Sequence, residues 1–233
     1  MYVIGVDLGT QSMKGFLVDA QGKFVAESSA AYDPVYPFPA WTEENPADWI
    51  HAFKKIVKDL MEISGLCRTY GITKCTKVIR GGETRAHSVL LAALEASPGV
   101  KLLAVQDGAR PLVTPEVIER TISAAVRCGA AAPAVPVKDT VKEVRDGGAV
   151  ERTVDRTSLR AVQTPQVFDA SLLKAALQDA VENRIPITDD CSAVERLGKV
   201  VFLVDGEEEN LKITTPVDMI LAEAILRARE NRA

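Results

Sequence analysis

From Val78 onward, short apolar runs alternate with segments of helical periodicity, and this alternation constrains the fold more than any other feature of the chain. The helices carry signals at their ends: Thr114 and Pro115 are typical of a helix start, and Gly129 is typical of a helix stop. The predicted strands cover residues 102–105, 132–137 and 200–204, and the predicted helices cover 114–127, 170–182, 189–197 and 216–229. Strands separated by helices indicate an α/β fold with a parallel sheet.

A predicted hairpin interrupts this alternation within residues 138–160. Two short strands, 141–144 and 149–154, flank the turn Asp146-Gly147-Gly148. An isolated two-stranded hairpin buries little apolar area. We therefore expect this arm to project from the sheet and to need a partner.

The composition changes near Ser64-Gly65. Residues 1–65 hold nine of the twelve aromatic residues, with 5 basic and 9 acidic side chains, whereas residues 66–233 hold 23 of each charge. Two parts that differ this much in core-forming residues and in charge indicate two modules. The expected domains are therefore 1–65 and 66–233.

The first module predicts an antiparallel meander followed by one helix. Its strands are expected at 3–6, 13–19 and 23–28, joined by turns at 9–12 and 20–22. Asn45 and Pro46 then occupy the positions of an N-cap and a first helical residue, and apolar residues continue at helical spacing to Met61.

Charge and hydropathy exclude several classes of partner. The formal net charge is -4 and no basic block occurs, so the sequence predicts neither nucleic-acid binding nor attachment to an anionic membrane. The first apolar run, Tyr2–Val6, has no basic region before it and ends at Asp7, which argues against a signal peptide or a spanning helix. The four cysteines are too far apart in sequence for a metal or redox pair. We expect a cytoplasmic protein with reduced thiols.

Polar motifs follow the strands of the second module, and their order is informative. In chain order they are Gly81–Val89, Asp107–Pro111, Asp139–Lys142, Asp155–Arg156, Gln163–Gln166, Thr188–Asp190 and Asn210–Thr214. Seven motifs in this order resemble the 2-C-methyl-D-erythritol 4-phosphate cytidylyltransferase family over residues 70–233. The ribitol-phosphate cytidylyltransferases share much of the pattern, so either polyol phosphate remains open as the acceptor.

The resemblance implies a Rossmann-like nucleotidyltransferase sheet with a projecting β-arm, and transfer of CMP from CTP to the polyol phosphate with release of pyrophosphate. Such a reaction needs Arg, Lys, Mg²⁺ and backbone N–H groups to neutralise many phosphate oxygens. Mg²⁺ is expected to accompany CTP. A homodimer formed through the 138–160 arm is also implied.

By motif position, the resemblance implies three groups of site residues. Those expected at the cytosine and ribose of CTP are Gly81, Gly82 and Ser88. The expected catalytic residues are Lys212, Asp107 and Arg110, with Asp107 also facing the metal, because an Asp at a strand end lies where α/β sheets bind ligands. Those expected to hold the substrate phosphate, together with Lys212, are Thr140, Arg156 and Thr164.

Two departures from the family pattern stand in this sequence. Gln106 and Gly108 flank the strand-end aspartate where the family usually has His and Ala. The family also opens with a strand and a small-residue, glycine-rich loop that grips the CTP triphosphate, and no such loop occurs before Val78. The sheet is therefore expected to be truncated at its start, and activity to be impaired.

In place of the glycine-rich loop, the chain has a segment that resembles the start of the FGGY carbohydrate kinases, of the xylulokinase type, over residues 1–63. The resemblance rests on the turn Asp7–Lys14 and the tract Pro39–Trp49. The catalytic aspartate and adenosine site of that family lie in a longer chain, so kinase activity is not expected. Two readings besides the enzyme remain: a non-catalytic dimerising or ligand-binding remnant, and a sugar kinase fragment.

Overall fold

A computed structural model describes residues 2–8, 12–19, 24–33, 45–69, 72–75 and 77–231. The chain forms two compact units, Met1–Gly82 and Glu83–Ala233. Within the described residues, no helix is both long enough and apolar enough to cross a membrane.

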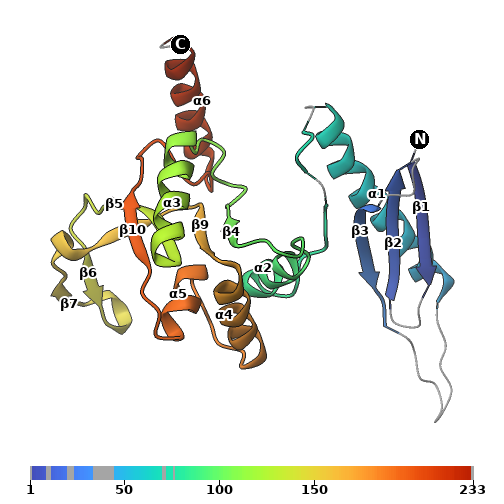
Figure 1. Cartoon of the computed structure of the whole chain (residues 1–233), viewed down its shortest axis with the longest axis horizontal. Coiled ribbons are helices and arrows are strands. Elements are labelled where there is room, and N and C mark those ends of the chain that lie inside the picture. Colours follow the sequence, from blue (N-terminus) through green and yellow to red (C-terminus); the bar gives the residue numbers. More distant parts are fainter. Residues whose placement is uncertain are drawn as a thin grey trace. The chain divides into compact units, whose positions relative to one another are not determined.

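The first unit is a three-stranded antiparallel sheet covered by one helix (Figure 1). The elements are β1 (Tyr2–Leu8), β2 (Ser12–Asp19), β3 (Phe24–Ala31) and α1 (Pro46–Thr69). Among the described residues, the core between sheet and helix includes Met13, Ala30, Ala52 and Ile56. The predicted meander and helix are thus confirmed, while residues 9–11 of the kinase-like turn and 39–44 of the kinase-like tract lie outside the described residues.

The compact units do not divide at the predicted seam. Ser64 and Gly65 lie inside α1, which continues to Thr69, and the first unit extends to Gly82. The change in composition therefore lies inside α1 and precedes the boundary between the compact units.

The second unit contains a five-stranded sheet with the order β10-β5-β9-β4, and with β8 paired to β5. Its strands are β4 (Leu102–Val105), β5 (Ala130–Pro136), β8 (Arg160–Val162), β9 (Gln166–Asp169) and β10 (Phe202–Asp205). The α/β class is confirmed, but the expectation of a parallel sheet is wrong for β9. β9 lies between β4 and β5 and runs antiparallel to both, whereas β5 and β10 are parallel.

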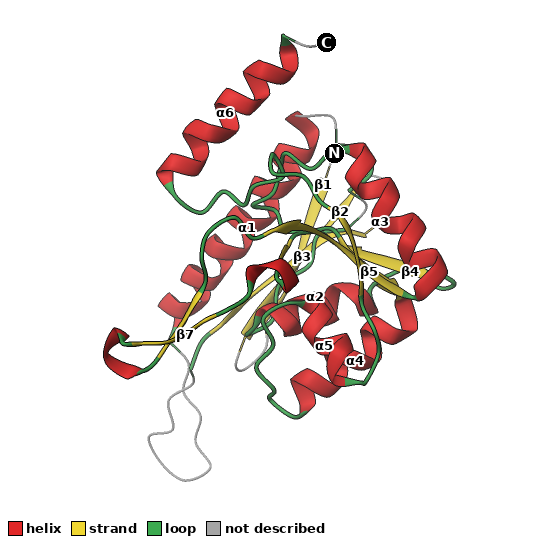
Figure 2. Ribbon diagram, turned by 90° about the vertical axis from the view of Figure 1, so that its left-hand side faces the viewer, coloured by secondary structure: helices red, strands yellow, loops and turns green. Residues whose placement is uncertain are grey.

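Helices cover both faces of this sheet (Figures 1 and 2). α3 (Pro115–Cys128) packs on one face, and α4 (Ala170–Glu182) and α5 (Asp190–Arg196) pack on the other. α2 (Arg85–Leu94) packs against α4, and α6 (Pro216–Glu230) projects away from the sheet. Alternate residues of a strand point to opposite faces, so Ala130 and Ala132 pack with α4 and α5, while Ala131 packs with α3. Alanine at these positions allows helices to approach the sheet closely on both sides.

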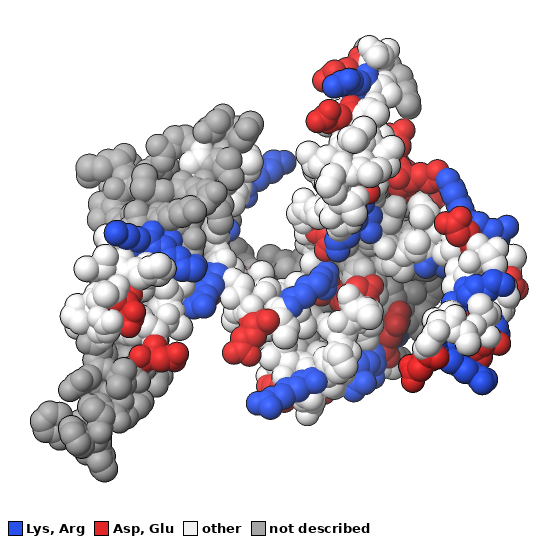
Figure 3. Space-filling view, turned by 180° about the vertical axis from the view of Figure 1, so that it is seen from behind, with Lys and Arg blue, Asp and Glu red and all other residues white. Residues whose placement is uncertain are grey.

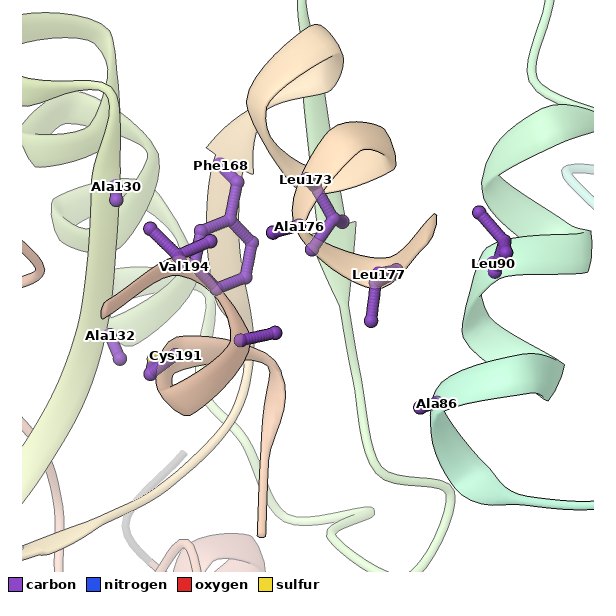
Figure 4. Close-up of a cluster of buried hydrophobic side chains, with 11 residues drawn as sticks. Ala86, Leu90, Ala130, Ala132, Phe168, Leu173, Ala176, Leu177, Cys191 and Val194 are labelled. Atoms are coloured by element: carbon purple, nitrogen blue, oxygen red, sulfur yellow. The ribbon is translucent and has the colours of Figure 1, made fainter. Parts of the chain in front are cut away.

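Phe168 of β9 is the centre of the larger core (Figure 4). It is fully buried beside Ala130 and Ala132 of β5, Leu173 of α4 and Val194 of α5. The core therefore fixes β9, α4 and α5 to one another, and the loops at their ends are held in defined positions.

The predicted arm is confirmed as a hairpin that extends away from the sheet (Figures 1 and 2). It consists of β6 (Lys142–Val144) and β7 (Val150–Thr153), joined by a tight turn at Asp146–Gly148 in which Gly147 has a φ of 83°. Every residue of the two strands is exposed. Two ion pairs join its two sides, between Arg145 and Glu151 and between Arg152 and Glu143.

Candidate functional site

The charged side chains from several of the sequence motifs meet around Asp107. This residue follows β4, Lys212 lies in the loop between β10 and α6, and Arg85 opens α2. Lys212 Nζ lies 3.0 Å from Asp107 Oδ2, and an Arg85 terminal nitrogen lies 3.7 Å from Oδ1. We call these residues, with Arg110 and Asp190, the Asp107 cluster.

Asp107 is held as an anion. Its side chain is only 18% exposed, and burial alone would raise the pKa of this carboxyl. The hydrogen bond and charge of Lys212, together with the charges of the two arginines, outweigh burial and lower the pKa of Asp107. A ligand phosphate would therefore compete with an existing carboxylate for Lys212.

Arg85 is fixed by a bidentate pair with a buried carboxylate. Its two terminal nitrogens donate to Asp190 at 3.0 and 2.7 Å, and Asp190 is fully buried. Burial raises the pKa of Asp190, and the Arg85 hydrogen bond opposes that increase. A buried charge without its partner costs several kcal/mol, so the pair ties the start of α2 to the start of α5.

Gln166 of β9 completes this connection. Its side-chain oxygen accepts hydrogen bonds from the backbone N–H groups of Asp190 and Cys191, and its nitrogen donates to Asp189. Asp189 in turn caps α5 by accepting from the Ser192 N–H. The first turn of α5 is therefore held by the same strand that carries Phe168 in the core.

Thr164 lies behind Asp107 rather than on an open surface. It is 4% exposed, accepts a hydrogen bond from the Asp107 N–H at 3.0 Å, and donates to Gln106 Oε1 at 2.9 Å. In this structure its hydroxyl fixes the backbone of the strand-end aspartate. Gln106, which stands where the family usually has His, thus accepts the hydrogen bond of the Thr164 hydroxyl.

Arg110 is anchored by the loop that also carries Lys212. One terminal nitrogen donates to the Asn210 carbonyl at 2.6 Å, and the buried Asn210 amide donates to the carbonyl of Thr164. The Arg110 Nε and the Asn210 Oδ1 are buried without a hydrogen-bond partner in the described part of the chain. Burial lowers the pKa of Arg110, and Asp107 opposes this decrease.

Other expected site residues are not part of this cluster. Thr140 and Arg156 are exposed at the arm, where the Arg156 guanidinium donates to the Lys138 carbonyl. Ser88 lies in the first turn of α2, where its hydroxyl donates to the Thr84 carbonyl. Gly81 and Gly82 are the last residues of the first unit.

The cluster does not have the composition of a resident metal site. Within the described residues, no three His, Cys, Asp or Glu side chains lie close enough to hold a metal ion. Mg²⁺ typically uses one or two carboxylates together with substrate phosphates. Asp107 therefore fits a metal that enters with a nucleotide, and it does not fit a metal held by protein ligands alone.

Sequence reasoning gave no role to Arg85, Asp190, Gln166 or Asn210, although all four lie in the motifs. The only sequence signal for these four residues was that they lie in polar motifs next to predicted strands and helices. Their contacts join residues as far as 105 positions apart, so sequence spacing could not pair them.

The acid sensitivity of the second unit is expected to depend on Asp107. Because the folded pKa of Asp107 lies below the usual pKa of an aspartic acid, its ionised form stabilises the fold at neutral pH, and this stabilisation is lost as the pH falls through the folded pKa. The difference in urea midpoint between the native chain and Asp107→Asn should shrink below about pH 4. A difference that stays constant down to pH 2 would contradict the assignment.

Comparison with known proteins identifies two families along the chain. Residues 52–228 match the model of the 2-C-methyl-D-erythritol 4-phosphate cytidylyltransferase family. Residues 2–77 match the N-terminal domain of the FGGY family of carbohydrate kinases. Both resemblances expected from the motifs are confirmed.

Curated relatives and solved structures support the first match. The 2-C-methyl-D-erythritol 4-phosphate cytidylyltransferase of Bacillus cereus is 48% identical over 166 residues, which cover 71% of this chain and 73% of the relative. The enzyme of the same name from Desulforamulus reducens is 50% identical over 156 residues, which cover 67% of each chain. The Thermus thermophilus cytidylyltransferase structure has a TM-score of 0.60 at 41% identity, covering 66% of this chain and 76% of that chain. The 4-diphosphocytidyl-2C-methyl-D-erythritol synthase of Anaerococcus prevotii has a TM-score of 0.62 at 31% identity, covering 75% and 74%.

Proposed function

The chain belongs to the 2-C-methyl-D-erythritol 4-phosphate cytidylyltransferase family, and we propose that its second unit carries the acceptor half of a site that transfers CMP from CTP to 2-C-methyl-D-erythritol 4-phosphate. The observation that carries this proposal is the Asp107 cluster. It places Lys212 against Asp107 at the end of β4, with both arginines close enough for their charges to act on the same carboxylate. We place the reaction in the cytoplasm.

Lys212 and Arg110 are the cations that we assign to the acceptor phosphate. Lys212 has a half-exposed side chain, so it can exchange the Asp107 carboxylate for a phosphate oxygen without leaving the cluster. Arg110 is anchored through Asn210 and would supply fixed positive charge. Asp107 then becomes available to the polyol hydroxyls or to the metal of the CTP complex.

The proposed step is an in-line substitution at phosphorus. An oxygen of the acceptor phosphate attacks the α-phosphorus of CTP, and the bond from that phosphorus to the bridging oxygen of the β-phosphate breaks. Pyrophosphate leaves with the electron pair of the broken bond. Mg²⁺ bound to the nucleotide phosphates supplies charge neutralisation.

We propose that activity is impaired because the part of the site that binds CTP is incomplete. The resemblance assigns the cytosine end to Gly81, Gly82 and Ser88, but the triphosphate-gripping loop has no counterpart ahead of Val78. Transition-state stabilisation by positioned donors is the largest single contribution in many enzymes. A ligand-binding remnant is therefore the second candidate, and it is favoured by the same missing loop.

Acceptor binding tests the assignment of Lys212. Replacing the ammonium by a thioether in Lys212→Met should weaken binding of methylerythritol phosphate about tenfold or more, because charge-assisted bonds are worth about 1.5–3 kcal/mol. Lys199→Met removes an exposed lysine outside the cluster and is the matched control. Titration calorimetry measures both, and equal affinity of the two variants would remove Lys212 from the site.

The arm is proposed to form a homodimer and to carry Thr140 and Arg156 to the phosphate pocket of the partner. A two-fold interface joins the same surface of both copies, and the exposed Val144 and Val150 would be buried there. Deleting residues 141–154 should give monomers and weaken acceptor binding together. Arg156→Ala should weaken binding and leave the dimer, whereas Arg160→Ala should change neither. Sedimentation of the intact chain as a monomer at tens of micromolar protein would refute this assembly.

A further inference from the structure

β4 is an end strand of the sheet, although its sequence is that of a central strand. Leu102–Val105 is entirely apolar, without the charged residues or proline that protect exposed edges. Continuous apolar runs are typical of strands covered on both faces and paired on both sides. In the described part of the second unit, however, β4 pairs only with β9.

The direction of the unpaired backbone groups follows from the β4–β9 ladder. The Ala170 N–H donates to the Lys101 carbonyl at 2.9 Å, which makes that opposed pair a hydrogen-bonded one. Hydrogen-bonded and non-bonded pairs alternate in antiparallel ladders, so Leu103 and Val105 bond toward β9. The N–H and C=O groups of Leu102 and Ala104 therefore point away from β9, along the open edge.

An apolar hollow of about 390 Å³ lies beside this edge. Its lining includes Leu103 and Val105 of β4, Ala92 and Ala93 of α2, and Leu173 of α4. α2 packs against α4. A strand on the open edge would direct every second side chain into this hollow, since alternate residues share one face.

We propose that the open edge of β4 and this hollow bind an apolar β-strand supplied by another polypeptide. The solved Thermus thermophilus chain is covered over only 76% of its length, so relatives possess a segment without counterpart here. A second copy of this chain is the less suitable occupant, because its own α2 would come to the same side of the joined edge. The occupant is thus a separate extended segment with apolar residues at alternate positions.

Two variants test this surface without disturbing the core. Ala92→Asp places a carboxylate in the hollow from an exposed helical position, and Ala104→Pro removes an N–H from the open edge and none from the β9 ladder. Ala175→Asp makes the same substitution at an exposed position of α4 outside the hollow and is the control. Circular dichroism and thermal unfolding establish that each variant is folded.

The probe is a fluorescein-labelled fragment consisting of the residues of the Bacillus cereus relative that precede its aligned region. Fluorescence anisotropy should show saturable binding to the native chain and to Ala175→Asp, weakened about tenfold or more in Ala92→Asp and Ala104→Pro. Absence of binding to the native chain, or equal binding by all folded variants, would overturn the proposal. A homodimer of the native chain that Ala104→Pro dissociates would also overturn it, because the occupant would then be a second copy.

Discussion

Turnover of CTP with methylerythritol phosphate and Mg²⁺ is expected to be at least about 10⁴-fold slower than the ordinary enzyme range of about 1–10³ s⁻¹. Each missing oxyanion donor costs about 10²–10³-fold, and the absent loop would supply at least two such groups. Under the proposed assignment, the cations of the Asp107 cluster bind the acceptor phosphate and not the three phosphates of CTP. Coupled detection of pyrophosphate measures the rate.

A chimaera provides the control for this prediction. Replacing residues 1–65 by the start of the Bacillus cereus relative should raise the rate if the missing loop is the defect. Lys212→Met in the chimaera should then lower it again, which separates restored chemistry from a contaminating activity. An ordinary rate in the native chain, or an inactive but folded chimaera, would contradict the account.

Removing the buried carboxylate of Asp190 is expected to cost about 3 kcal/mol of folding stability. In Asp190→Ala, the partly buried Arg85 loses its bidentate partner and the buried position loses its charge. For a chain of this size, the melting temperature of the second unit should fall by about 10 °C. Differential scanning calorimetry measures the shift.

The reciprocal variant separates a lost pair from a general packing defect. Arg85→Met combined with Asp190→Leu removes both charges and should recover much of the lost stability, because replacing a buried ion pair by apolar residues is often neutral. Asp190→Glu keeps the carboxylate at this position but lengthens the side chain, so it tests the geometry of the pair alone. A double variant as unstable as the sum of its single variants would show that the two residues act independently.

Helix ends were predictable because their signals are local. Thr114 and Gly129 act as caps at the predicted positions, and α4 begins at the residue expected. β9 was not predicted, since Gln166–Asp169 holds only two apolar residues and its central place depends on pairing with two distant strands. The same omission explains why a parallel sheet was expected.

The resemblance to a family, by motif position, was the source of the site prediction, and the roles of the residues remain predictions. The resemblance assigned Asp107, Arg110 and Lys212 to one site, and the structure places Lys212 against Asp107 with the charge of Arg110 acting on the same carboxylate. Arg85 and Asp190 could not be paired, because their contact depends on how α2 and α5 pack on the same sheet. Thr164 was expected at a phosphate, and its buried contact with the Asp107 backbone becomes visible only in three dimensions.

Titration of the native chain with its two substrates tests the central claim most directly. The account predicts saturable binding of methylerythritol phosphate, measured by calorimetry, together with binding of Mg–CTP that is at least about a hundredfold weaker than in the chimaera. Ribitol 5-phosphate in the same cell measures the choice of acceptor. Tight binding of Mg–CTP to the native chain, or no binding of either polyol phosphate, would contradict an intact acceptor half beside an incomplete nucleotide half.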